Sequence, residues 1–210
     1  MTKKKIKEII DALKILYPDA KCSLTYEKPH ELLIATRLSA QCTDARVNIV
    51  TETLFKEFKS VEEFAQAPIE RLEEIIHPCG LYKTKARDTK KMCQQLLENY
   101  NGQVPDSIEE LTKLSGIGRK TANLIMGDIY GQPAYVCDTH CIRITNRLGI
   151  TDSKDTLKVE NQLRKSLPPE ESNDFCHRTV LFGRDICTAR SPKCENCPLN
   201  NLCPSATKDK

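Results

Sequence analysis

The chain has no tryptophan, few aromatic residues and no long apolar run. Aromatic side chains make up 5% of its 210 residues, which disfavours a single-strand binder that stacks bases on aromatic platforms and leaves duplex DNA open as a partner. No segment approaches the roughly 20 apolar residues of a membrane-spanning helix. The start, MTKKKIKEII, has lysines but lacks the apolar run of a signal peptide. We therefore expect an intracellular protein with no membrane partner.

Cysteine is too sparse for a disulfide scaffold. The 11 cysteines are about 5% of the chain, below the roughly 8–10% of a disulfide-stapled secreted protein, and their number is odd. Reduced thiols inside the cell are available for metal or redox chemistry, so the spacing of the cysteines is more informative than their number.

The small net charge of +3 is unevenly distributed. Residues 82–91 contain five Lys or Arg and one Asp, whereas residues 52–74 contain seven Glu and three basic residues. A basic strip beside an acidic region indicates a polyanionic partner. Solvated helix faces that happen to differ in charge explain the same pattern equally well.

Apolar residues recur at helical spacing along most of the chain. Residues 3–17 have the pattern of an amphipathic helix that ends before Pro18. Two capping boxes, Ser60 with Glu63 and Ser107 with Glu110, mark the starts of further helices. No alternating run of four or more residues indicates a strand, so the sequence predicts an all-α fold.

A glycine-containing turn, Ser115-Gly116-Ile117-Gly118, separates predicted helices at 107–114 and 119–130. Two glycines around one apolar residue permit a tight turn whose amides, with the free amides that begin the second helix, point outward. Such amides can bind a phosphate without reading a base, and Arg119 and Lys120 add positive charge. The alternative is a glycine-rich connection between packed helices.

Four cysteines cluster in a proline-rich tail. Cys187, Cys194, Cys197 and Cys203 are separated by six, two and five residues. Four soft ligands in a segment poor in core residues indicate a metal centre. Zinc and a [4Fe–4S] cluster both accept four cysteines, and the spacing alone does not fully separate them.

The loop between the first two of these cysteines contains two cations, Arg190 and Lys193. A metal centre that makes the loop rigid would hold both side chains ready for DNA phosphates. The other seven cysteines share no ligand spacing. A second metal at Cys137, His140 and Cys141 is the alternative to our expectation that these seven are buried thiols.

Lys120 is out of place as a structural residue. In the first turn of a helix, the positive end of the dipole disfavours an ammonium by about 0.3–1 kcal/mol, which favours the neutral, nucleophilic amine. Lowering its pKa from about 10.4 to 7 requires roughly 4.6 kcal/mol, so burial against an enclosed substrate must contribute. The alternative is a lysine that contacts phosphate. Asp138, before Thr139, is first of all a helix N-cap.

Several segments resemble the endonuclease III family of DNA glycosylases. They are LSGIGRKTANLI at 114–125, YVCDTHCIRITNRLG at 135–149, LSAQCTDARV at 38–47, GLYKTKA at 80–86 and the C-terminal cysteines. The first two segments are similar to the helix-hairpin-helix and the Gly/Pro-Asp element of that family, with Gly131-Gln132-Pro133 as the Gly/Pro part. The resemblance covers nearly the whole chain.

The resemblance implies a bifunctional glycosylase and abasic-site lyase that removes oxidised pyrimidines from duplex DNA in base excision repair. Lys120 would displace the base and form a Schiff base with the sugar, and Asp138 would stabilise the developing positive charge. Gln41 and Leu81 would fill the gap left by the extruded nucleotide. His140 and Asp44 are weaker candidates for the base pocket, since each is also explained by its place at a helix start.

The resemblance also implies the architecture and the cofactor. One helical lobe, residues 22–133, would contain the hairpin, and residues 1–21 with 134–210 would form the other, with a [4Fe–4S] cluster in the loop at 187–203. We expect a monomer that binds duplex DNA with damaged bases or abasic sites, in the cytoplasm or nucleoid if the source is prokaryotic.

Two alternatives remain at this stage. A glycosylase that only removes the base, such as an adenine glycosylase, would have no lysine at position 120 and an additional C-terminal domain. A non-catalytic helix-hairpin-helix module would bind duplex DNA and contribute no chemistry.

Overall fold

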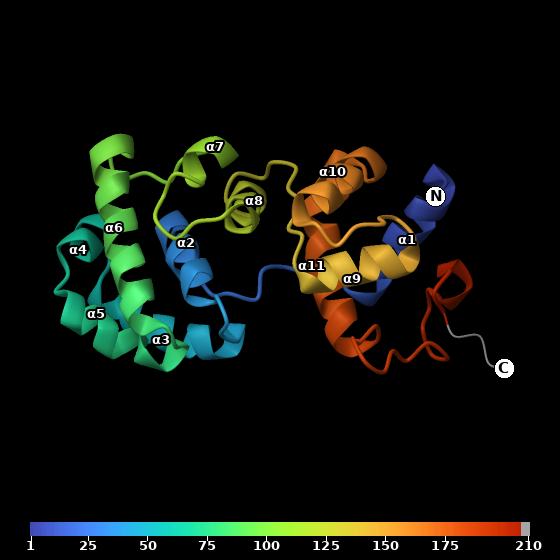
Figure 1. The fold of residues 1–210 in the computed structure, drawn as a ribbon, viewed down its shortest axis with the longest axis horizontal. Helices are drawn as coiled ribbons and strands as arrows, with labels where there is room; N and C mark the ends of the chain where they lie inside the picture. Colours follow the sequence, from blue (N-terminus) through green and yellow to red (C-terminus); the bar gives the residue numbers. More distant parts are fainter. Residues whose placement is uncertain (207–210) are drawn as a thin grey trace. The chain divides into compact units, whose positions relative to one another are not determined.

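The computed structural model describes residues 1–206 as helices joined by loops (Figure 1). The α-helices are α1 (Lys3–Leu16), α2 (Pro29–Leu38), α3 (Asp44–Glu57), α4 (Val61–Gln66), α5 (Ile69–Ile76), α6 (Tyr82–Tyr100), α7 (Ile108–Leu111), α8 (Arg119–Asp128), α9 (Thr139–Leu148), α10 (Thr156–Ser166) and α11 (Ser172–Asp185). Three short 3₁₀ helices are η1 (His77–Cys79), η2 (Pro169–Glu171) and η3 (Asn200–Leu202). No strand occurs in residues 1–206, so the predicted all-α fold is confirmed for them.

The chain divides into two compact units. The continuous unit comprises Cys22–Tyr130, and the discontinuous unit comprises Met1–Lys21 with Gly131–Lys210. The continuous unit is built around α2, which is buried on all sides because it is apolar on nearly every face; Leu32, Leu33 and Ile34 are fully inaccessible. Helix α6 packs against α4, α5 and α2.

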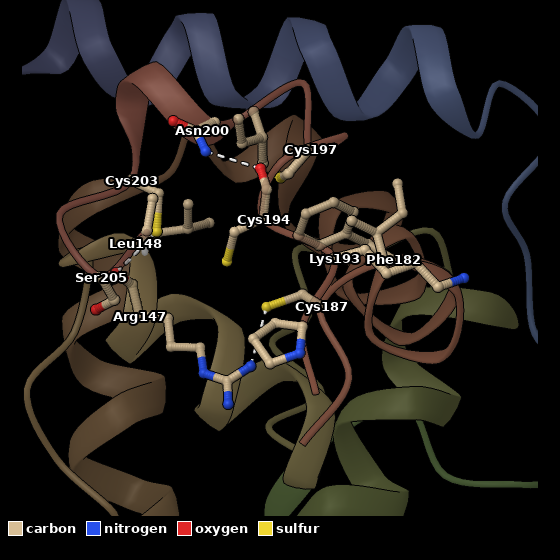
Figure 2. A pocket seen from close by; sticks show the side chains of 14 residues that line it. Arg147, Leu148, Phe182, Cys187, Lys193, Cys194, Cys197, Asn200, Cys203 and Ser205 are labelled. Atoms are coloured by element: carbon tan, nitrogen blue, oxygen red, sulfur yellow. Dashed lines mark hydrogen bonds between the residues drawn. The ribbon is translucent and has the colours of Figure 1, made fainter. Parts of the chain in front are cut away.

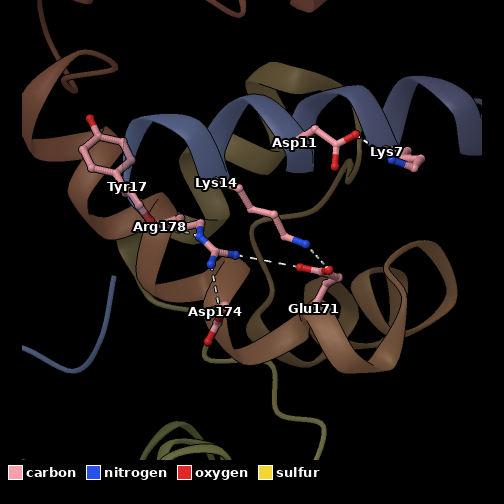
Figure 3. A network of polar contacts seen from close by, with 7 residues as sticks. All are labelled: Lys7, Asp11, Lys14, Tyr17, Glu171, Asp174 and Arg178. Carbon is pink, nitrogen blue, oxygen red and sulfur yellow. Dashed lines mark hydrogen bonds and ion pairs between the residues drawn. The ribbon is translucent and has the colours of Figure 1, made fainter. Parts of the chain in front are cut away.

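In the discontinuous unit, α1 packs on α11 through an apolar face that includes Ile9 and Leu13. Figure 3 shows the polar contacts beside this face. Lys14 on α1 pairs with Glu171, and Arg178 on α11 donates to the backbone oxygen of Tyr17 at 3.2 Å. These contacts join the start of the chain to its last long helix.

The hairpin begins as predicted but its first helix is shorter. Ser107 caps α7 by accepting the Glu110 amide at 3.3 Å, yet the helix ends at Leu111 and not at 114. The Thr112 hydroxyl donates to the Ile108 oxygen at 2.9 Å, and the next amides bond three residues back, so the chain tightens into turns. The predicted second helix, 119–130, likewise ends early, at Asp128.

Candidate functional site

The two glycines of the hairpin, Gly116 and Gly118, differ in what the structure requires of them. Gly116 has a φ of +76°, and an added Cβ would lie 2.5 Å from Nε of Arg37. It therefore packs directly on the ion pair in which Arg37 donates to Asp88 at 2.8 and 2.6 Å. At Gly118 the φ is −102°, which any residue adopts, and nothing lies within 4 Å of an added Cβ. The space on the Cβ side is therefore filled at Gly116 by Arg37 and Asp88 and open at Gly118.

The amides of the turn are not all available to a ligand. Ile117 is buried, and its amide donates to the Leu114 oxygen at 3.1 Å, while the Ser115 amide donates to the Gln95 side chain at 2.8 Å. The outward amide cluster expected for the whole turn is therefore wrong at Ile117, which anchors the hairpin in the core. Gly116, Gly118 and the start of α8 remain exposed.

Helix α8 begins with no side-chain cap and no acidic residue in its first turn. Its first amides and the positive end of its dipole therefore lack the usual compensation, which makes the helix start attractive to an anion. Lys120 is exposed in this first turn. An exposed lysine amine and a helix start without an acidic residue or side-chain cap thus occupy the same few residues.

The thiol of Cys22 lies near Lys120 and near two carboxylates. The pKa of Cys22 is raised to about 12, mainly by burial; the carboxylates of Asp128 and Asp44 contribute to the increase, and the Lys120 ammonium opposes it. All three charged groups therefore lie within electrostatic range of Cys22. Sequence reasoning did not single out Asp128. The sequence showed only that it is an acidic residue near the end of α8, the helix that contains Lys120.

Asp44 is not the N-cap of α3. Thr43 occupies the cap and accepts the Arg46 amide at 3.3 Å, so Asp44 is the first helical residue. A carboxylate there is stabilised by the dipole of its own helix. Its proximity to Cys22, on which Lys120 also acts, is the feature that sequence spacing could not provide.

Gln41 and Leu81 both have left-handed backbones. Gln41 has a φ of +57° in a turn closed by the Cys42 amide, which donates to the Ser39 oxygen at 3.0 Å. Leu81 has a φ of +50°, directly before α6. Such a conformation costs a residue other than glycine about 1–2 kcal/mol. Both side chains are exposed, 57% in the case of Leu81, so neither predicted DNA-contact residue is fixed by core packing.

Asp138 is the N-cap of α9, as the sequence predicted. One carboxylate oxygen, Oδ1, accepts the Cys141 amide at 2.7 Å, which leaves Oδ2 for another partner. His140 lies in the first turn, where its Nδ1 is 3.2 Å from Nη2 of Arg143, and it packs against Gly183 of α11. Asp138 and His140 belong to the discontinuous unit, and Lys120 belongs to the continuous unit.

The four C-terminal cysteines line one cavity of about 140 Å³. Figure 2 shows Cys187 and Cys194 with their sulfurs turned toward the same space. In residues 1–206 no three His, Cys, Asp or Glu side chains are arranged for a single metal ion. The cavity is roughly ten times the 10–15 Å³ that one water molecule needs, so its size suits a polynuclear cluster.

The electrostatics of this cavity also suit a cationic cluster. Burial raises the pKa of Cys197 and Cys203, and the thiolates of Cys187 and Cys194 raise both further. Four thiolates therefore repel one another unless positively charged metal lies between them. The residues present fit an iron–sulfur group.

Two arginines on α9 support the cysteine loop, and the sequence analysis missed both. Arg147 donates to Sγ of Cys187 at 3.3 Å and to the Thr188 oxygen at 2.7 Å. Arg143, one turn earlier, donates to the Cys187 oxygen at 3.2 and 3.0 Å. Their four-residue spacing on one helix face was a signal, but nothing in the sequence indicated what that face would meet.

Arg190 and Lys193 are exposed in the same loop. In Figure 2 the side chain of Lys193 extends away from the sulfurs. Their position is therefore compatible with contact to an external anion, whereas the arginines of α9 are committed to the loop itself.

The basic strip at 82–91 is smaller at the surface than its sequence suggests. Lys85 is fully buried, and Lys90 donates to the Ala67 oxygen at 2.7 Å. Lys83, Arg87 and Lys91 remain exposed. The count of five cations overstated the charge offered to a polyanion, because helical periodicity turns one of the five inward.

In residues 1–206 the remaining seven cysteines form no group of three side chains arranged for a metal ion. Five of them are buried as expected: Cys79, Cys93, Cys137, Cys141 and Cys176. The expectation is wrong for Cys22 and Cys42, which are only partly buried. Both lie in or next to loops, where the chain does not enclose them fully.

Comparison with known proteins identifies two matching family models. Residues 34–169 match the HhH-GPD superfamily of base excision DNA repair proteins, and residues 187–203 match the iron–sulfur binding domain of endonuclease III. The second match confirms the prediction of an iron–sulfur site over zinc.

Whole-length relatives and solved structures agree with these models. The chain is 43% identical to endonuclease III of Bacillus subtilis (strain 168), over 98% of this chain and 94% of that one, and 38% identical to that of Escherichia coli (strain K12), over 97% and 96%. A trapped endonuclease III–DNA covalent intermediate matches with a TM-score of 0.92 and 45% identity, over 98% of this chain and 97% of that one. The chain therefore belongs to the endonuclease III family.

Proposed function

We propose that this protein is a bifunctional DNA glycosylase and abasic-site lyase of base excision repair, which removes oxidised pyrimidines from duplex DNA. The observation that carries the proposal is Lys120, exposed in the uncapped first turn of α8 beside the open backbone at Gly118. The similar endonuclease III trapped in a covalent complex with DNA supports an enzyme that bonds to its substrate.

Lys120 is the proposed nucleophile. Its neutral Nζ attacks C1′ of the damaged nucleotide, the bond from C1′ to the base breaks, and the base leaves with a proton. The bond between C1′ and the ring oxygen O4′ then breaks, O4′ takes up a proton, and a protonated Schiff base remains between Nζ and C1′. This cation acidifies C2′, and removal of a C2′ proton expels the 3′ phosphate by β-elimination.

Asp138 is proposed to assist at the sugar. Its Oδ1 holds the start of α9, so the carboxylate is fixed in direction before the substrate arrives. The other oxygen stabilises the positive charge that develops on the sugar as the base departs. His140 and Asp44 are proposed to line the base pocket, Asp44 because it and Lys120 both lie within electrostatic range of Cys22.

Gln41 and Leu81 are proposed to occupy the space left by the extruded nucleotide. Extrusion costs a few kcal/mol of lost stacking, and an inserted side chain recovers part of it. Exposure and left-handed backbones at both residues support this role. The DNA backbone would be bound by Gly116, Ile117 and Gly118, with Ile117 acting through its packing.

The [4Fe–4S] cluster is a structural cofactor of this reaction. Cys187, Cys194, Cys197 and Cys203 are its proposed ligands. When bound, it supplies cross-linking of an irregular loop and no electron to the glycosylase chemistry. The loop then presents Arg190 and Lys193 to DNA phosphates.

The protein is proposed to act as a monomer inside the cell, in the cytoplasm or nucleoid if the source is prokaryotic. The described residues contain no helix long and apolar enough to cross a membrane.

Borohydride trapping tests the proposed function. The whole protein, mixed with duplex DNA that contains an oxidised pyrimidine or an abasic site, should give a covalent adduct on reduction. Lys120→Ala should abolish the adduct. Lys113→Ala is the matched control, because Lys113 is an exposed lysine of the same hairpin and pairs with Glu110.

The outcomes separate the alternatives. Base release without an adduct would leave a glycosylase that only removes the base. Binding without base release would leave a non-catalytic DNA-binding module. An adduct that survives Lys120→Ala would assign the nucleophile elsewhere.

A further inference from the structure

A buried lysine joins the two loops that carry Gln41 and Leu81. Lys85, in the first turn of α6, is fully inaccessible to solvent. Its Nζ donates to the backbone oxygen of Leu38 at 2.7 Å and to that of Cys79 at 2.8 Å. In the part of the chain that the structure describes, no carboxylate forms an ion pair with it. A buried ammonium held only by two carbonyls needs a reason beyond packing.

The two carbonyls lie at the bases of the two loops. Leu38 is the last residue of α2, and Gln41 follows three residues later; Cys79 ends η1, and Leu81 follows two residues later. The last carbonyls of a helix have no partner within it, and the negative end of the helix dipole attracts a cation. Lys85 therefore satisfies the end of α2 and fixes its distance from η1.

A second link runs between the same loops. The thiols of Cys42 and Cys79 lie close enough to interact, and after burial it is the Cys42 thiol that most raises the pKa of Cys79. Burial lowers the pKa of Lys85, and the two thiols oppose this shift. Lys85 and the thiol pair thus both lie between the segment after α2 and the segment before α6.

The loops need such support because their backbones are strained. Only three residues other than glycine have a positive φ in residues 1–206, namely Gln41, Leu81 and Asn101. Asn101 ends α6, where a left-handed asparagine is common. Strained conformations persist only when the surrounding structure imposes them. For Gln41 and Leu81 the surrounding structure is the pair of segments that Lys85 joins.

We infer that Lys85 is a positioning residue that holds Gln41 and Leu81 at a fixed separation for insertion into DNA. The inference rests on the proposed function, because it assumes that both side chains enter the duplex. Lys85 itself touches neither the substrate nor the reacting atoms. Without it, the two loops sample other conformations, and the Gln41 and Leu81 side chains must be ordered when the protein binds DNA.

A double-mutant cycle tests the inference in the cluster-containing protein. Lys85→Met keeps the length and removes the donors, and it should slow single-turnover formation of the borohydride-trapped adduct on an oxidised-pyrimidine duplex about tenfold, which equals about 1.4 kcal/mol. In a Gln41→Ala/Leu81→Ala background the same substitution should change the rate less than about twofold. Lys56→Met, an exposed lysine of α3, is the control expected to behave as wild type.

Hydrogen exchange gives a readout without DNA. The Cys42 amide, which closes the turn at Gln41, should exchange faster in Lys85→Met than in Lys56→Met. If Lys85→Met loses cooperative unfolding or cluster absorption, Lys85→Gln, which removes the charge and presents two N–H donors on a shorter side chain, takes its place in both experiments.

Three results would overturn the inference. They are an unchanged rate in the Lys85 variant, an equal loss with and without Gln41 and Leu81, and a double alanine variant as fast as wild type. In each case the adduct through Lys120 would still form. Absence of any adduct in the wild-type protein would instead refute the proposed function itself.

Discussion

Replacing Gly116 by alanine should destabilise the protein through two effects, an unfavourable backbone conformation and a clash with Arg37. The left-handed backbone at φ +76° costs alanine about 1–2 kcal/mol. The new methyl would lie 2.5 Å from Nε and 2.7 Å from Cδ of Arg37, so the guanidinium must move off Asp88. Hydrogen bonds between charged groups are worth about 1.5–3 kcal/mol. With partial relaxation, the expected loss in the free energy of unfolding is about 2–4 kcal/mol.

Gly118→Ala is the matched control because it leaves the same hairpin intact. Its backbone suits alanine and nothing lies within 4 Å of the added Cβ, so stability should stay within about 0.5 kcal/mol of wild type. If a phosphate approaches the start of α8 at this point, the methyl group should nevertheless weaken DNA binding by roughly tenfold, or about 1.4 kcal/mol.

Thermal unfolding and fluorescence anisotropy measure the two effects separately. For a chain of this size a loss of about 3 kcal/mol lowers Tm by roughly 6–12 °C. Anisotropy with a duplex that contains a stable abasic-site analogue gives the affinity. The reasoning would be refuted if Gly116→Ala unfolded at the wild-type temperature, or if Gly118→Ala bound DNA as tightly as wild type while remaining folded.

Three further outcomes are expected. Arg147→Met removes the donor to Cys187 Sγ, so the cluster's visible absorption should decay faster under an iron chelator; an unchanged decay would contradict the role of that contact. Burial lowers the pKa of His30 below its ordinary value of 6.5. As the pH falls, His30 therefore binds a proton in the unfolded chain at a higher pH than in the folded protein, so the free energy of unfolding should decrease below about pH 6.5. His30→Gln should flatten this dependence in urea titrations between pH 7 and 5, and an equal slope would assign it to other groups. Raising salt should weaken DNA binding with a log–log slope of roughly 0.9 per phosphate neutralised, whereas a flat response would argue against phosphate contacts.

Local sequence signals predicted the elements but not their partners. The capping residues Ser60, Ser107 and Asp138 each accept a backbone amide where expected, because a cap involves residues only three apart. The first hairpin helix was predicted too long, since apolar spacing continued through Leu114 while the Thr112 hydroxyl drew the chain into turns. Competition between side chain and backbone is not visible in apolar periodicity.

Long-range contacts were beyond the reach of sequence reasoning. Lys85 was counted as part of a basic surface, yet it is enclosed and bound to carbonyls 47 and six residues away. Arg147 reaches the cysteine loop across 40 residues. Side-chain type indicates that such residues need partners, but only the folded chain shows where the partners are.

The sequence by itself determined the all-α class, the hairpin, the four-cysteine centre and the family, because each depends on residue types at short, fixed spacings. The tertiary structure decided why Gly116 must be glycine while Gly118 is unconstrained, and which carboxylates lie, like Lys120, within electrostatic range of Cys22. It also decided that Lys85 joins the loops of Gln41 and Leu81. These features depend on which segments pack together, and packing is set by the whole core at once and not by any local pattern.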